Sequence, residues 1–139
     1  MIQFRMIRIN TEQFAILEKD LRKEETYSLE TAIAFAVDSK EHIVANRMKI
    51  EIKTKDQLVA LLELVCLFEI HPESWNEILQ VDKIVVPKDT LSHLAVHTVG
   101  TARGILHCKT EGTPFNTMIL PPLNLVEMIT EDLSVSIDK

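Results

Sequence analysis

The sequence contains little glycine, little cysteine and no continuous apolar leader. Three glycines in 139 residues are too few for a loop-rich chain, and two cysteines are too few for a disulfide scaffold. Cys66 and Cys108 do not form a Cys-x-x-Cys motif, so we expect both thiols to be free and buried. The N-terminal stretch interleaves arginines with apolar residues, so we do not expect it to be a signal peptide.

An excess of basic residues is missing too. Fifteen lysines and arginines stand against 21 acidic residues, and the formal net charge of −6 leaves no basic surface for nucleic acid. The apolar run at residues 57–70 is shorter than the ~20 residues of a membrane span, so we expect no membrane insertion. A hydrophobic content of 46% is enough for one core. We therefore expect a single domain, residues 1–139, of a soluble cytoplasmic protein.

Residues 57–70 predict a strand that is apolar on both faces. One face carries Leu58, Ala60, Leu62, Leu64, Cys66, Phe68 and Ile70. The other face carries Val59, Leu61, Glu63, Val65, Leu67 and Glu69. Leaving the four apolar residues of this second face in water forgoes roughly 1.5–3 kcal/mol each, so we expect it to meet another layer, another subunit or a client. A fully buried helix is the alternative to a strand.

The residues before this segment predict three more strands, at Ile2–Ile9, Tyr27–Asp38 and His42–Thr54. Asn10–Glu25 is expected to be a charged connection. His42–Thr54 alternates strictly, with Val44, Met48, Ile50 and Ile52 inward, which is typical of an antiparallel sheet with one wet face. Lys55 and Asp56 form the expected turn into the fourth strand. Residues 1–70 thus predict a four-stranded antiparallel sheet, rich in meander connections.

Residues 88–110 predict one long helix. Asp89 or Thr90 is the expected N-cap, and Gly112 lies just past the end. Gly100 and Gly104 each cost ~1 kcal/mol in a helix interior. A close helix contact between subunits explains the two glycines, and ordinary packing on the sheet is the alternative. Residues 73–86, before the helix, are expected to be irregular apart from a helical turn.

Residues 111–125 predict an extended crossover loop, because Pro114, Pro121 and Pro122 exclude a regular helix or central strand. Its apolar residues need a surface that shelters them: Phe115, Met118, Ile119, Leu120, Leu123 and Leu125. Residues 126–139 form a short C-terminal segment, with a short helix expected at 126–133. The predicted fold class is therefore α+β: a four-stranded antiparallel sheet, one long helix and an extended crossover loop.

Motifs for catalysis and metal binding are missing from the sequence. His93 and His97 share a helix face, but no HExxH motif and no third ligand at a suitable spacing accompany them. We predict no metal, no cofactor and no enzymatic activity. If the chain is instead a small-ligand-binding or metal-binding domain, these two histidines are the first residues to test.

The order of several short motifs resembles SecB, the bacterial protein-export chaperone family. The family has three motifs in order: Ala-Arg-Glu, Gly-Thr-Phe-Pro and Leu-x-Pro-x-Asn-Phe. Similar segments follow in the same order here, namely Ala102-Arg103, Gly112-Thr113-Pro114-Phe115 and residues 120–125 (LPPLNL). The opening IQFRMIRI and the segments HIVANRMKIEIKT and QLVALLELVCLFEI are similar to family strands in the same order. Gly104 replaces the acidic residue of the first motif, and the family's second helix and acidic tail have little counterpart here.

The resemblance implies an ATP-independent holdase that binds unfolded preproteins in apolar grooves and passes them to the SecA motor. It implies a homotetramer, a dimer of dimers, with Gly100 and Gly104 at an oligomer interface and Glu63 as a SecA contact. The predicted client-binding residues are Val59, Leu61, Val65, Leu67, Phe115, Met118, Ile119 and Leu120. A SecB-like chaperone for the antitoxin of a toxin–antitoxin pair is one alternative function. A non-chaperone oligomer or a ligand-binding domain is another.

Overall fold

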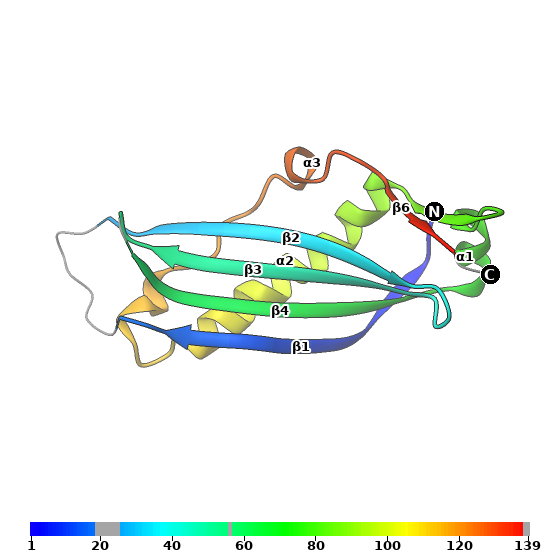
Figure 1. Cartoon of the computed structure of the whole chain (residues 1–139). Helices are drawn as coiled ribbons and strands as arrows, with labels where there is room; N and C mark the ends of the chain where they lie inside the picture. Colours follow the sequence, from blue (N-terminus) through cyan, green and yellow to red (C-terminus); the bar gives the residue numbers. More distant parts are fainter. Residues whose placement is uncertain (19–25, 56, 138–139) are drawn as a thin grey trace.

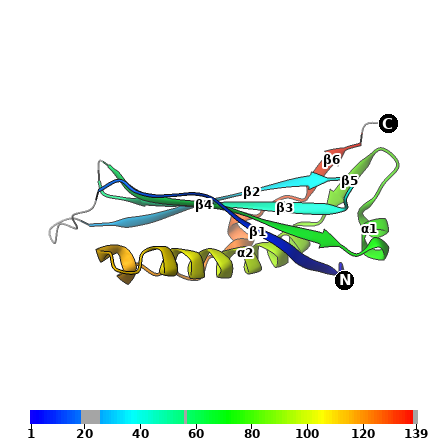
Figure 2. The ribbon, with the colours of Figure 1, turned by 90° about the horizontal axis from the view of Figure 1, so that it is seen from below.

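The computed structural model describes residues 1–18, 26–55 and 57–137. Four antiparallel strands form the main sheet: β1 (Phe4–Ile16), β2 (Ser28–Asp38), β3 (Ile43–Lys53) and β4 (Leu58–Ile70). Their order is β1-β4-β3-β2, so β2, β3 and β4 form a meander and β1 pairs with β4. The long helix α2 (Lys88–Lys109) packs on one face of the sheet (Figures 1 and 2). The α+β fold class is confirmed.

Shorter elements connect and follow the long helix. They are α1 (Pro72–Ile78), β5 (Lys83–Val86), the 3-10 helix η1 (Pro114–Thr117), α3 (Leu125–Met128) and β6 (Leu133–Ser136). β5 and β6 pair as a small second sheet. The helical turn expected within residues 73–86 is present as part of α1, but the expectation that the rest of this segment is irregular is wrong, since it contains β5. Proline suits the first turn of α1, and the His71 ring accepts a hydrogen bond from the Glu73 amide there.

The first strand is longer than its sequence pattern indicates. β1 continues to Ile16, so the prediction of a strand ending at Ile9 and a connection from Asn10 is wrong. Two register shifts, at Ile7 and Glu12, insert one extra residue each against β4. Each bulge moves the following side chains to the other face, which breaks the period-two alternation that marks a strand. Residues 19–25 of the predicted connection, and Asp56 of the predicted turn, lie outside the described residues.

The core lies between the two central strands and α2. The inward set predicted for β3 is confirmed, since Val44, Met48, Ile50 and Ile52 are all buried. On β4 the face toward the helix is buried at Ala60, Leu62, Leu64, Cys66, Phe68 and Ile70. From α2 the buried side chains are Leu91, Leu94, Ala95, Val99, Ala102 and Leu106. Burial of each large apolar side chain contributes roughly 1.5–3 kcal/mol, which fixes the helix against the sheet.

The start of α2 is capped from a distant part of the chain. The helix begins at Lys88, and neither Asp89 nor Thr90 is its N-cap, contrary to the prediction. Instead Asp132 Oδ1 accepts a 2.8 Å hydrogen bond from the Lys88 amide. A carboxylate there also complements the positive end of the helix dipole. At the other end Gly112 follows the helix with φ of +79°, a conformation that glycine adopts without steric cost.

The C-terminal part of the chain returns to the start of the long helix. α3 is only one turn, capped by Asn124, whose Oδ1 accepts from the Glu127 amide. The chain then becomes β6, so the predicted helix over 126–133 is wrong beyond Met128. Residues 133–136 form a strand despite their local helix propensity, because pairing with β5 provides hydrogen bonds to the backbone groups of both strands.

Candidate functional site

The face of the sheet away from α2 is the first candidate binding surface. β4 places Leu61, Val65 and Leu67 there, and the antiparallel register sets Leu67 beside Ala45 of β3. β2 adds a row of exposed alanines: Ala32, Ala34 and Ala36. Among the described helices, α2 lies on the opposite face and none covers this one (Figure 2). We call this surface the outer face.

An ion pair crosses the middle of the outer face. Arg47 Nη1 lies 2.6 Å from Glu63 Oε1, and its Nη2 lies 3.9 Å from Glu12 Oε1. Arg47 is the cross-strand neighbour of Val65. Because the arginine side chain is 48% exposed, the pair adds little to stability, but it places a carboxylate among apolar side chains. Glu63, predicted to contact SecA, therefore lies among the apolar client residues of β4.

The crossover loop is the second candidate surface. Hydrogen bonds between side chains and backbone carbonyls join it to α2. Arg103 donates from Nε to the Leu120 carbonyl at 2.6 Å and from Nη2 to the Pro121 carbonyl at 3.2 Å. Asn116 Nδ2 donates to the His107 carbonyl at 2.9 Å. These contacts fix an otherwise irregular segment along the helix and leave Ile119 61% exposed.

The eight predicted client residues fall into two separate surfaces within this chain. Leu61, Val65 and Leu67 lie on the outer face, whereas the loop residues lie on the α2 side of the sheet. Val59 sits at a β4 register shift and packs with Phe115 in a small buried cluster. Val59, Phe115 and Leu120 are each 1% exposed, and Val65 is 7% exposed. The accessible members are Leu61, Leu67, Met118 and Ile119.

A small apolar cleft opens where the crossover loop begins. Its volume is about 260 Å³, and it is lined by Ile16 and by residues 112–115. Phe115 forms one wall and meets the Tyr27 ring edge-on, with centroids 6.1 Å apart. Sequence reasoning missed Ile16, because the two bulges of β1 hide that strand from a period-two search. An apolar recess of this size suits one side chain of a bound polypeptide.

The exposed face of α2 is open at both predicted interface glycines. Apart from the neighbouring residues and backbone of its own helix, a Cβ added at Gly100 or at Gly104 meets no described atom within 4 Å. Val96, one turn before Gly100, is 57% exposed. Ordinary packing on the sheet therefore does not explain the glycines within this chain.

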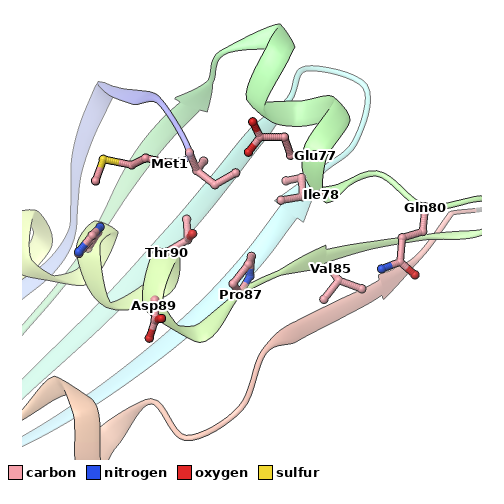
Figure 3. A pocket seen from close by; sticks show the side chains of 10 residues that line it. Met1, Glu77, Ile78, Gln80, Val85, Pro87, Asp89 and Thr90 are labelled. Carbon is pink, nitrogen blue, oxygen red and sulfur yellow. The ribbon is translucent and has the colours of Figure 1, made fainter.

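The remaining ionisable side chains of the described residues include the types that bind metal ions in proteins. Among the described residues no group of three or more His, Cys, Asp or Glu is arranged to hold a metal ion. His93 lines a cleft of about 460 Å³ where the N-terminus, α1, β5 and the start of α2 meet. Figure 3 shows Glu77 and Asp89 on opposite sides of this cleft. In the described part of the chain no hydrogen bond joins these three side chains.

The two cysteines have different surroundings. Both are free, but only Cys66 is buried, so the prediction that Cys108 is buried is wrong. Burial raises the pKa of the Cys66 thiol, and hydrogen bonds with Thr98 and Thr101 partly oppose that shift. Cys108 lies in the last turn of α2, on the side away from the sheet. The raised pKa of Cys66 opposes formation of the thiolate, so this thiol is not an activated nucleophile.

Within the described residues no helix is both long enough and apolar enough to cross a bilayer. No protein-family model matches the sequence, and no curated protein sequence matches it. A similar solved structure is the SecB-like chaperone Rv1957 of Mycobacterium tuberculosis, in complex with a ChAD peptide from the Rv1956 HigA1 antitoxin. The two chains are 19% identical over 88% of this chain and 90% of that one, with a TM-score of 0.48. A similarity at this level assigns no function to the chain.

Proposed function

We propose that the chain is an ATP-independent holdase that binds unfolded preproteins in the cytoplasm and keeps them competent for export through the Sec pathway. It works as a homotetramer, a dimer of dimers, without a cofactor and without a catalytic step. The observation that carries this proposal is the accessible apolar surface at Leu61, Leu67, Met118 and Ile119. The order of SecB-like motifs in the sequence supports the same function.

Burial against a client is the source of affinity. Each accessible leucine, methionine or isoleucine contributes roughly 1.5–3 kcal/mol when a client covers it fully. Because this term has no direction, such a surface binds many unfolded chains with little sequence selectivity. Val59, Val65, Phe115 and Leu120 are buried, and in this proposal they support the two surfaces from beneath.

The assembly and the handover partner complete the proposal. The open face of α2 around Gly100 and Gly104 is the helix contact between dimers, which leaves the outer face for clients. Glu63 is the contact for SecA by electrostatic complementarity. Because Arg47 already engages its carboxylate, a basic SecA side chain would compete with Arg47 for the same oxygen.

The direct test measures light scattering of a diluted, denatured model preprotein with and without the protein. We expect suppression of aggregation at a near-stoichiometric ratio. Leu67→Asp and Ile119→Asp should each weaken suppression several-fold, since a carboxylate in an apolar contact must be desolvated. Val81→Asp is the matched control, because Val81 is 87% exposed and lies in neither surface.

Wild-type protein that leaves aggregation untouched would overturn the holdase proposal. Full suppression by both surface variants would instead overturn the assignment of these residues. An antitoxin used as the diluted client in a parallel assay separates the antitoxin alternative from general export, since a dedicated chaperone would protect only that client.

A further inference from the structure

The two edges of the main sheet are built differently. β1 forms one edge, and it has two bulges and carries Arg5 and Arg8. β2 forms the other edge, and its register with β3 runs without a shift from Ser28 to Asp38. The sequence of β2 contains neither proline nor lysine. Bulges and edge charges are the usual protection against pairing with another chain, so β1 is protected and β2 is much less so.

A groove runs beside the unprotected edge. It has a volume of about 330 Å³ and lies between β2, at Ile33, Ala34 and Phe35, and residues 128–133, with Leu91 of α2 also lining it. Figure 1 shows β2 as the outermost strand of the sheet, with α3 and β6 beyond it. A strand added along β2 would point every second side chain toward this groove. Its other side chains would lie beside the exposed alanines of the outer face, which leave room for them.

The charges around this edge distinguish between two occupants. Glu30 and Asp38 lie toward the ends of β2, and Glu131 and Asp132 line the groove. One cation lies beside these carboxylates: Lys53 Nζ is 2.9 Å from Glu30 Oε2 and pairs with it. A second copy of β2 in full antiparallel overlap would set each Glu30 diagonal to the other copy's Asp38, about 7–8 Å apart. Like charges therefore oppose self-pairing and favour a segment that carries basic residues.

We propose that the edge of β2 and the groove beside it bind an extended client segment as a fifth strand, in which apolar residues alternate with basic or small polar ones. This inference rests on the proposed holdase function and gives it a binding surface separate from the outer face and the crossover loop. Backbone hydrogen bonds to β2 hold any extended chain, while the groove selects the apolar alternation.

The first test uses a peptide as long as β2, in which leucine and valine alternate with lysine and threonine. Hydrogen exchange of the β2 amides is followed with and without the peptide. We expect new protection in β2 and little change in β1. Two further versions of the peptide carry backbone N-methyl groups, one on its odd residues and one on its even residues. Only one of them should lose binding, because a strand forms hydrogen bonds with a neighbouring strand through the backbone of alternate residues. Equal binding by both versions would overturn strand addition.

The second test changes the wall of the groove. Met128→Asp should weaken peptide binding about tenfold or more, since Met128 lines the groove and is already 39% exposed, so folding should tolerate the change. Val126→Asp is the matched control on the same turn, because Val126 is 78% exposed and outside the groove. A version of the peptide with glutamate in place of lysine should bind more weakly than the original. Equal affinity for both peptides would contradict the charge argument.

The holdase assay keeps the two proposals distinguishable. If wild-type protein suppresses aggregation but the β2 amides gain no protection, strand addition is wrong and the holdase function stands. If wild-type protein neither suppresses aggregation nor binds the peptide, the holdase function is wrong and this inference falls with it.

Discussion

Cys66 and Cys108 carry the same thiol group but lie on opposite sides of α2. Cys66 is fully buried beneath the helix, whereas Cys108 lies in the last helical turn and is exposed. Only the thiolate attacks disulfide reagents, so reactivity requires both access and ionisation. Cys66 has neither at neutral pH, because burial excludes the reagent and raises the pKa of its thiol.

We expect a thiol reagent such as Ellman's reagent to label Cys108 quickly in the native protein and Cys66 only after unfolding. Labelling of Cys108→Ala isolates the buried thiol, and Cys66→Ala isolates the exposed one. Rapid native labelling of Cys108→Ala would show that Cys66 is open to solvent and would contradict the packing described here.

The raised pKa of Cys66 also makes stability depend on pH. The unfolded thiol ionises near its ordinary value of about 8.5, while the folded thiol still holds its proton. The stabilisation from the neutral thiol is therefore complete below about pH 8.5 and decreases as the pH rises toward the folded pKa. Urea unfolding between about pH 7 and 10 should show this decrease in Cys108→Ala. The free energy of unfolding should fall less steeply with pH in Cys66→Ala than in Cys108→Ala. Identical slopes in the two variants would contradict this role of the Cys66 thiol.

At the scale of elements, the sequence predicts what local patterns decide. β3 alternates apolar and polar residues with period two, and β4 is apolar on both faces. The apolar residues of α2 recur at helical spacing. The existence and type of these three elements are therefore predictable from the sequence. β1 could not be followed past Ile9, since its bulges reverse the alternation twice. The cap of α2 could not be found either, because Asp132 comes from 44 residues further along the chain. Among the contacts of the candidate site, Arg103 and its two loop carbonyls likewise depend on the tertiary fold.

The glycines of α2 and of its exit should respond oppositely to alanine. Gly104→Ala should raise the free energy of unfolding by about 0.5–1 kcal/mol, since alanine favours a helix and its methyl group meets no described atom beyond its own helix. Gly112→Ala should lower it by roughly 1–2 kcal/mol, because φ of +79° suits glycine alone. Chemical denaturation at low protein concentration measures both, so that assembly does not contribute. A loss of stability in Gly104→Ala would show that position 104 is crowded in the dilute protein.

At the scale of the whole molecule, the outer face and the exposed face of α2 suit different partners. The outer face offers apolar side chains around an ion pair, which suits a changing client. The exposed face of α2 offers Val96, Gly100 and Gly104, a smooth stripe on a long rigid helix, which suits close contact with a second helix. Under the proposed function, clients and subunits would therefore not compete for one surface, and the assembly would persist while it binds and releases polypeptides.

Multi-angle light scattering should find a tetramer for the wild-type protein, and Val96→Glu should shift it to dimers or monomers. Val96 is 57% exposed in the single chain, so the glutamate costs the fold little but would bury a charge in a helix contact. Val81→Glu is the control, because Val81 is 87% exposed and lies in the turn before β5, away from α2's exposed face. If Val96→Glu remains tetrameric, the subunits meet elsewhere. If that variant dissociates but still suppresses aggregation, the dimer or monomer binds clients without the tetramer, which then serves another step.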